Sequence, residues 1–313
     1  MSILAKKYFY DEAAAFEHVE KVLWPEGPVC HHCGSIKKPY KLAGVRSKAS
    51  KKNPNGTERH GLYKCADCRG QFTVRMGTIF EESHIQLHKW LQAIHLMCIS
   101  KKGISAHQMH RTLEVTYKSA WFLCHRIRFA MQGTNLEPMG GEGKIVEVDE
   151  TYIGRLEGAK KKVRGGGHKN IVVTLVERGG ESRSFHAEGY RRKDVEELML
   201  KNIKKETAIM TDEALQYRAV GENFASHAFV NHTKDEYVRG IVSTNTVEGF
   251  YSIFKRGMNG VYQHCSEHHL HRYLAEFDFR YSNRIATGIN DECRSHKALV
   301  KVIGKRLTYQ QSN

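Results

Sequence analysis

Three acidic residues in the second half of the sequence have the types and positions needed to bind divalent cations. Asp149 follows the strand-like run at residues 144–148, and Asp212 follows the short apolar run at residues 207–211. Glu248 lies in the first turn of a helical segment, with 35 residues between it and Asp212. Carboxylate oxygens are the ligands that Mg²⁺ and Mn²⁺ prefer, so three of them from two strands and a helix can hold two ions.

Two such ions about 4 Å apart activate a water or a 3′-hydroxyl and stabilise the leaving oxygen in an in-line attack on a phosphodiester. Lys255 follows Glu248 by seven residues, two turns along the same helical face, and can steady a phosphate. Each acid also has a plainer interpretation, because Asp149 and Glu150 can close a hairpin turn and the other two acids can cap helices. The joint pattern favours the metal site.

Four cysteines have the spacing of a second metal site. Two C-x2-C pairs are separated by 31 residues, and their members are Cys30, Cys33, Cys65 and Cys68. Four thiolates in two such loops are what a closed, tetrahedral structural zinc site needs. The alternatives are four unrelated thiols or a redox pair, but neither pair opens a helix in a βαβ unit. The spacing therefore predicts a zinc ribbon.

The charge of the chain indicates a polyanionic partner. With 49 Lys and Arg against 34 Asp and Glu, the formal net charge is +15, which favours nucleic acid. The length of 313 residues and the 40% hydrophobic content predict a globular protein of two or more domains. No apolar run reaches about 18 residues, and the first residues lack a long apolar stretch, so we expect a cytoplasmic protein without membrane spans.

Helical periodicity predicts three helices after the cysteine region, at residues 87–102, 105–115 and 116–132. Ser105 and Thr116 are suitable N-caps for the second and third helices. Two helices joined so tightly predict either a helix-turn-helix, whose second helix enters the major groove, or an ordinary αα-hairpin. In the first case the basic residues of the third helix contact DNA, and these are Lys118, Arg126 and Arg128.

The second half of the sequence alternates between strand-like and helical patterns. Three strands are predicted first, followed by a helix, a fourth strand and a fifth strand, at residues 144–154, 168–178, 181–190, 193–203, 207–213 and 227–233. Two further helices are predicted at residues 246–257 and 267–284. This order is typical of a mixed α/β layer architecture.

The motifs resemble those of the zinc-ribbon DDE transposases of bacterial insertion sequences. VDETYIG (148–154), TDEAL (211–215) and NTVEGFYSIFKRG (245–257) carry the resemblance together with the cysteine set and the helix pair. It implies an RNase H-like fold with a mixed five-stranded sheet, with Asp149, Asp212 and Glu248 as the metal-binding catalytic triad and Lys255 as the trailing basic residue. Ser243 and Ser282 depart from the family pattern, which has histidine and asparagine there.

The resemblance also implies a domain order. We expect an N-terminal helix plus zinc ribbon, a helical DNA-binding segment, a linker, an RNase H-like catalytic domain and a C-terminal tail, at residues 1–83, 84–132, 133–143, 144–290 and 291–313. The glycine-rich basic turn at residues 160–170 is expected to grip the DNA backbone, together with a residue of the last motif, through Lys161, Lys162, Arg164 and Arg256.

The expected function is therefore that of a transposase. It would bind the terminal inverted repeats of its element, cut the phosphodiester at each end and join the freed 3′-ends to target DNA. Expected cofactors are Mg²⁺ or Mn²⁺ at the acids and structural Zn²⁺ at the cysteines, and expected partners are DNA and further copies of the chain at the bacterial nucleoid. Two alternatives remain open: a nuclease without strand transfer, and a zinc-ribbon DNA-binding regulator without catalysis.

Overall fold

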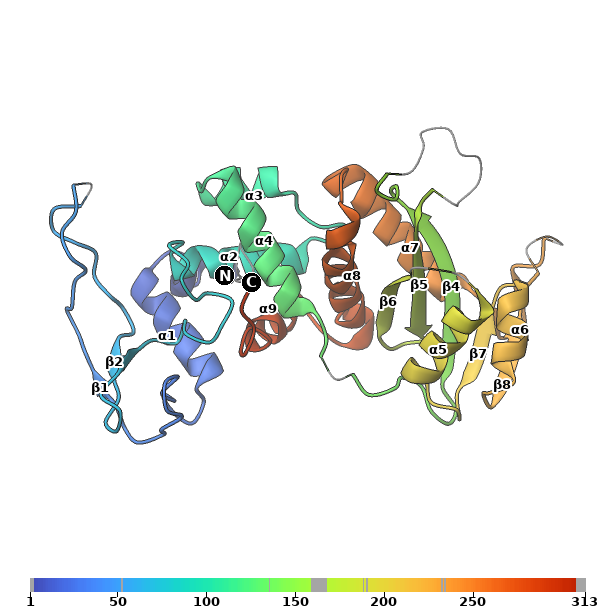
Figure 1. Ribbon diagram of the computed structural model, residues 1–313, viewed down its shortest axis with the longest axis horizontal. Helices are drawn as coiled ribbons and strands as arrows, with labels where there is room; N and C mark the ends of the chain where they lie inside the picture. Colours follow the sequence, from blue (N-terminus) through green and yellow to red (C-terminus); the bar gives the residue numbers. More distant parts are fainter. Residues whose placement is uncertain are drawn as a thin grey trace. The chain divides into compact units, whose positions relative to one another are not determined.

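The computed structural model describes residues 3–307, except for residues 52, 135, 159–167, 188, 190, 232 and 234. The chain forms two compact units (Figure 1). The first consists of Met1–Ser100, Ile104–Ala130 and Asp291–Asn313, and the second of Lys101–Gly103 and Met131–Asn290. Within the described part of the chain, every helix is too short or too polar to cross a membrane.

The first unit combines a small three-stranded sheet with helices. Its antiparallel sheet has the order β1-β2-β3, formed by Tyr40–Lys41, Tyr63–Lys64 and Gln71–Phe72. Its helices are α1 to α4 and α9, at Glu12–Leu23, Leu87–Ile99, Ala106–Leu113, Tyr117–Met131 and Asp291–Val300, and two short 3-10 turns precede them at Ile3–Ala5 and Lys7–Phe9. Asp11 caps α1 by accepting a hydrogen bond from the Ala14 backbone N–H.

Helices α3 and α4 form the tight helix pair that the sequence predicts. The Ser105 hydroxyl accepts a hydrogen bond from the Gln108 N–H at the start of α3, and the Thr116 hydroxyl accepts one from the Ser119 N–H at the start of α4. Glu114 ends α3 in the left-handed conformation, with φ of 52°, which turns the chain sharply into α4. The left-handed Glu114 and the Thr116 side-chain cap therefore fix the two boundaries of the turn.

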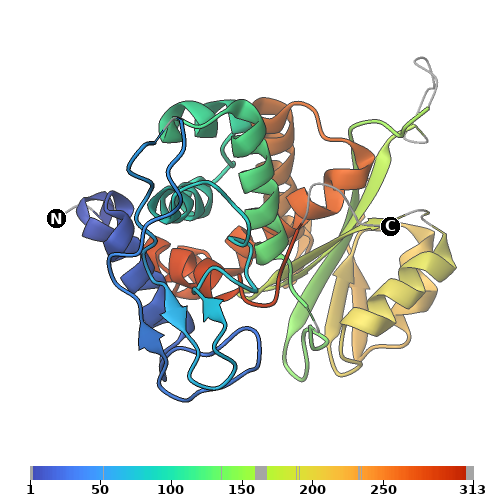
Figure 2. The same cartoon turned by 60° about the vertical axis from the view of Figure 1, so that its left-hand side comes forward.

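Residues 291–313, which we expected to be a tail, contain helix α9 of the first unit (Figure 2). Ala298, Leu299 and Val302 are buried. The buried Arg294 guanidinium donates to the Cys98 carbonyl at the end of α2. These apolar side chains lie on one face of the segment. Burial of that face within the first unit stabilises the segment as a helix.

The second unit contains a mixed five-stranded sheet, which confirms the predicted α/β class. Its order is β6-β5-β4-β7-β8, with antiparallel pairing from β6 to β4 and parallel pairing from β4 to β8 (Figure 1). The strands are Ile145–Ile153, Asn170–Glu177, Ser182–Ala187, Ala208–Thr211 and Ser226–Phe229 for β4 to β8 in chain order. The short turn at residues 178–181 favours the antiparallel pair of β5 and β6, and helix α5 (Arg192–Asn202) makes the crossover to β7.

Helices cover both faces of this sheet because its central strands bury apolar side chains on alternate sides (Figure 1). On one face, Val146, Val148, Val173 and Leu175 pack against α5 (Arg192–Asn202) and α6. On the other, Val172 and Val176 pack against α7 (Asn245–Gly257) and α8 (Glu267–Ser282). Neighbouring residues of β4 therefore face different layers.

Several elements of the second unit are not predicted from the sequence. Helix α6 occupies Leu215–Gly221, and the short strands β9 and β10, Val238–Arg239 and Val242–Ser243, form a hairpin before α7. A π-helical segment at Met258–Tyr262 continues α7, and a 3-10 turn at Ile285–Thr287 follows α8. These segments are short, so their periodicity is too brief to be recognised.

Candidate metal centres

The register of two parallel strands brings Asp149 and Asp212 together. In the β4–β7 pair, Glu147 lies opposite Met210. Two residues further along each strand direction stand Asp149 and Asp212, at equivalent positions of adjacent strands. Neighbouring strands lie about 4.8 Å apart, so the two carboxylates meet at this edge.

Glu150 joins these two acids. Asp149, Glu150 and Asp212 each offer a carboxylate oxygen, and the three atoms lie within 4.8 Å of one another. Because neighbours on a strand point to opposite faces, the sequence alone predicts that Glu150 lies outside the metal-binding set. The backbone does alternate, but the longer Glu150 side chain still reaches the cluster, where it accepts a hydrogen bond of 3.0 Å from the buried Tyr217 hydroxyl.

Glu248 is the fourth acid of this region and lies outside the group of three within 4.8 Å. It is exposed in the first turn of α7, where it accepts a hydrogen bond of 3.0 Å from the Thr244 hydroxyl. Burial, followed by the charges of Glu150, Asp212 and Glu248, raises the pKa of Asp149 to about 8. Four carboxyls so placed repel one another, and a bound cation relieves that repulsion.

Tyr251 and Lys255 lie one and two turns after Glu248 on α7. The Tyr251 hydroxyl is 2.6 Å from the Asp149 carbonyl oxygen and 3.2 Å from that of Val172, which docks α7 onto the two central strands. The exposed Lys255 ammonium lies 5.9 Å from the centroid of the Tyr251 ring. The Lys255 ammonium therefore lies near Tyr251, whose hydroxyl contacts the strand of Asp149.

Glu147 is a residue of this region that the sequence analysis misses. Its carboxylate is fully buried and binds the Arg178 guanidinium and the first turn of α7. A lone glutamate inside a strand gives no sequence signal for such a role. The two departures from the expected family pattern also have local partners, since Ser243 accepts a hydrogen bond from Arg178 and Ser282 accepts one from the Ser182 N–H.

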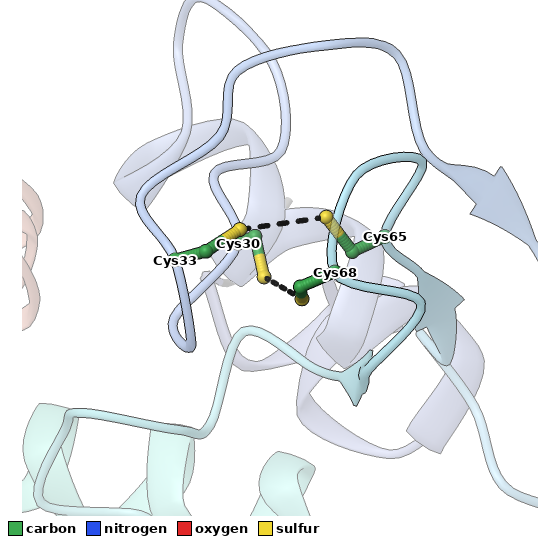
Figure 3. Close-up of side chains that lie close together, drawn as sticks. All are labelled: Cys30, Cys33, Cys65 and Cys68. Atoms are coloured by element: carbon green, nitrogen blue, oxygen red, sulfur yellow. Dashed lines mark hydrogen bonds between the residues drawn. The ribbon is translucent and has the colours of Figure 1, made fainter.

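The four cysteines come together from two loops of the first unit (Figure 3). The Cys30 and Cys68 sulfurs are 3.7 Å apart, as are those of Cys33 and Cys65. Four thiolates bound to zinc at about 2.3 Å would lie about 3.8 Å apart at the corners of a tetrahedron. The spacing of the sulfurs therefore fits a zinc ion, and the four thiols are a complete ligand set.

Local contacts stabilise the two cysteine loops in an arrangement that suits zinc binding. The backbone N–H of Cys68, opposed by burial, lowers the pKa of Cys65 to about 6, so its thiolate is populated at neutral pH. Asp67 in the second loop accepts hydrogen bonds from Ser35 and Lys37 in the first, at 2.6 and 2.8 Å. The pairing of strands β1 and β2 then closes the long connection between the loops.

The structure separates the seven expected DNA-contacting residues into different groups. Lys118 and Arg256 are exposed, on α4 and α7 respectively. Arg126 and Arg128 are buried, with 5% and 2% of their surface exposed. The Arg126 guanidinium donates to the backbone carbonyls of the first unit at Ile79, Glu81 and Leu307.

Two corrections follow for the predicted DNA contacts. Because Arg126 and Arg128 lie inside the first unit, they cannot be the phosphate ligands that the helical pattern predicted. Arg126 instead ties α4 to two other segments of the unit. Lys161, Lys162 and Arg164 lie outside the described residues.

Comparisons with known families agree with these two centres. Residues 140–282 match the ISXO2-like transposase domain, and residues 10–71 match the transposase zinc-ribbon domain. The first range contains all four acids, and the second contains all four cysteines. An uncharacterized protein in transposable element ISH50 of Halobacterium salinarum is 26% identical over 296 residues, which cover 88% of this chain and 92% of the relative.

The order of the two matched domains is the order of the two centres along the chain, with the cysteine cluster first and the carboxylate cluster second. The chain therefore carries a transposase zinc-ribbon domain followed by an ISXO2-like transposase domain.

Proposed function

We propose that the protein binds the terminal inverted repeats of its own insertion sequence, cuts the phosphodiester at the element ends and transfers the 3′-ends to target DNA. The observation that carries the proposal is the meeting of Asp149 and Asp212 at one edge of the sheet, with Glu248 next to them on α7. Carboxylate oxygens are suitable ligands for Mg²⁺ and Mn²⁺, and the net charge of +15 favours a polyanionic substrate.

The residues that would hold Mg²⁺ or Mn²⁺ are Asp149, Asp212 and Glu248, with Glu150 as a fourth carboxylate within reach of the first two. Bound divalent ions supply activation of a hydroxyl nucleophile and stabilisation of the leaving oxygen in phosphodiester chemistry. The fit rests on the close carboxyl oxygens and on the raised pKa of Asp149, because a nearby positive charge stabilises the ionised form of that carboxyl.

The remaining residues of the site would position the substrate. Lys255, which extends over Tyr251, contacts a non-reacting phosphate next to the cut bond. Arg256 is exposed on the adjacent helical position and contacts the backbone further along. These contacts are independent of base identity, so the catalytic unit does not choose the sequence.

Sequence choice would come from the first unit. The helix pair α3–α4 has the tight turn of a helix-turn-helix, and Lys118 is exposed at the start of its second helix. The zinc ribbon holds the loops before this helix pair. An element has two ends, so the active complex contains more than one copy of the chain.

A strand-transfer assay tests the proposed function. Purified protein is incubated with a labelled duplex that ends in the element's inverted repeat with its 3′-end already cut, together with Mg²⁺ and a target plasmid. A labelled strand joined to the plasmid is the expected product. Hydrolysis of uncut ends without any joined product would make the protein a nuclease, and tight binding without cleavage in Mg²⁺ or Mn²⁺ would make it a regulator.

A further inference from the structure

A buried glutamate two residues before Asp149 binds the helix that carries Glu248. Glu147 is fully buried on β4, and its two carboxylate oxygens have four donors. Oε1 accepts from Arg178 Nε at 2.6 Å and from the Thr246 hydroxyl at 2.8 Å. Oε2 accepts from the backbone N–H groups of Thr246 and Val247, at 2.8 and 3.0 Å.

These two N–H groups belong to the first turn of α7. The first four N–H groups of a helix have no partner within the helix, and a nearby negative charge stabilises them. Thr244, the residue before α7, makes no side-chain capping hydrogen bond to them. Glu147 therefore supplies the cap from a strand about 100 residues earlier in the sequence.

Arg178 fixes the segment that leads into the same helix. Besides Glu147, its guanidinium donates to the carbonyls of Ile241 and Ser243, at 2.7 and 3.0 Å, and to the Ser243 hydroxyl at 2.9 Å. Arg178 directly follows strand β5, which pairs with β4. The ion pair thus joins two central strands to the hairpin and to the start of α7.

The geometry relates this cap to the acid cluster. Glu147 and Asp149 are two residues apart on one strand, so their side chains lie on the same face of the sheet. Glu248 immediately follows Val247, one of the two capped residues. One rigid strand therefore holds Asp149 directly and Glu248 through the start of its helix.

Stability alone does not explain this arrangement. Removing two charges from water costs free energy that their attraction often fails to recover, and apolar residues of similar size can replace buried ion pairs without loss of stability. Residues that orient a metal ligand have a larger effect on binding. Their removal weakens the affinity of metal sites by about 10- to 100-fold.

We propose that Glu147, with Arg178, is a positioning residue that sets the place of Glu248 relative to Asp149 and Asp212. This inference rests on the proposed function, because it takes Glu248 to be a ligand of the catalytic cations. It adds a role that neither the acid cluster nor the family motif contains, since Glu147 itself contacts α7 and Arg178.

The test is a thermodynamic cycle on Mn²⁺ affinity, measured by electron paramagnetic resonance on the full chain with its ribbon zinc in place. Glu147→Gln keeps the shape of the side chain but removes its charge and presents an amide to the donors of α7. We expect Mn²⁺ to bind roughly 10- to 100-fold more weakly. In a Glu248→Gln background the same change should alter the affinity by less than about twofold, because the group it positions is gone.

A matched control comes from another buried ion pair of the second unit. Glu276 is also fully buried, and it pairs with Arg280 and accepts a hydrogen bond from the Tyr262 hydroxyl at 2.6 Å. Glu276→Gln should lower the stability of the protein and leave its Mn²⁺ affinity unchanged. If Glu147→Gln prevents folding, Arg178→Lys replaces it in the same cycle, since lysine keeps the positive charge but cannot reach all the carbonyl oxygens.

Two results would overturn the inference. One is an unchanged Mn²⁺ affinity in Glu147→Gln, and the other is an equal loss with and without Glu248. Asp149→Asn separates this failure from a failure of the proposed function. If Asp149→Asn weakens Mn²⁺ binding and Glu147→Gln does not, only the positioning role is wrong, whereas no effect of Asp149→Asn removes the metal site itself.

Discussion

The cysteine cluster and the carboxylate cluster are both candidate metal centres, but they are built in opposite ways. The cysteines come from two loops that close on each other, and their four sulfurs lie within 4.8 Å of one another. The acids come from two strands and a helix, and burial, together with the charges of the neighbouring acids, raises the pKa of Asp149. The first arrangement suits an ion that stays, and the second suits ions that arrive with a substrate.

The difference extends to what holds each centre in place. In the ribbon, the metal ion itself would join the loops, because the surrounding strands have only two residues each. In the second unit, protein contacts join the elements that carry the acids, namely the pairing of the strands, the Glu147–Arg178 pair and the Tyr251 hydroxyl. A closed centre thus depends on its metal for structure, whereas an open centre is prepared in advance for chemistry.

Loss of zinc should have the largest effect. Cys65→Ser removes one ligand of a site whose binding free energy contributes about 10–16 kcal/mol to the folding of small zinc domains. We expect the ribbon to lose its zinc and its order, while the second unit keeps its fold. Zinc content and hydrogen exchange at residues 24–83 measure the change. Cys293→Ser, at an exposed thiol outside the cluster, is the control, and an ordered ribbon without zinc would contradict the comparison.

The acid cluster should instead respond to pH when no divalent cation is added. The pKa of Asp149 is about 8 in the folded protein and about 3.9 in an unfolded chain. At pH values between these, the unfolded chain loses the proton and the folded protein keeps it, so stability falls as the pH rises. Above about pH 8 both states are ionised, and the full penalty is present.

Asp149→Asn isolates this contribution from other titrating groups such as Asp278, whose pKa burial raises to about 6. The wild-type protein should lose up to about 3 kcal/mol more stability than Asp149→Asn between pH 5.5 and pH 8. Urea unfolding of the second unit, with the ribbon zinc retained and no Mg²⁺ or Mn²⁺ added, gives the free energy of unfolding of each protein as a function of pH. If the two proteins show the same dependence on pH, the Asp149 carboxyl is ionised throughout this range.

A smaller effect should separate the buried from the exposed basic residues of α4. Arg126→Ala leaves three backbone carbonyls without their donor, so we expect it to lower stability by about 2 kcal/mol. Lys118→Ala should leave stability unchanged and reduce the dependence of DNA affinity on salt by about one unit of slope. Thermal unfolding and DNA binding at several salt concentrations measure both variants, and an unchanged salt slope in Lys118→Ala would exclude it as a phosphate contact.

The sequence predicts the cysteine cluster more completely than the carboxylate cluster, and the reason is physical. The spacing of the cysteines is local, so it defines the zinc ribbon without knowledge of the fold. The five strands of the main sheet and helices α5, α7 and α8 also follow from their periodicity, and the structure confirms their order. What links Asp149 to Asp212 is the parallel register of β4 and β7, which no local pattern contains.

Burial and long-range partners are the parts that the sequence does not predict. The helical pattern places Arg126 and Arg128 on a polar face, but other segments of the first unit cover them. The sequence predicts a tail at helix α9 because the apolar residues there are few and the partner helix, α2, lies almost 200 residues earlier. No local pattern singles out Glu147, because its partner α7 comes from elsewhere in the sequence. Strand alternation predicts Glu150 to lie outside the metal-binding set, and its contact with Tyr217 is not visible in the local sequence.

The most direct measurement is cleavage of a labelled duplex that carries the element's inverted repeat, by wild-type protein and by Asp149→Asn, with binding measured on the same samples. With Mg²⁺, the wild-type protein should cut at the repeat, and the variant should be slower by about 10⁴-fold or more while its affinity for the repeat stays within a few-fold. Equal losses of binding and cleavage would make Asp149 a structural residue and would contradict an open catalytic centre separate from the DNA-recognising unit.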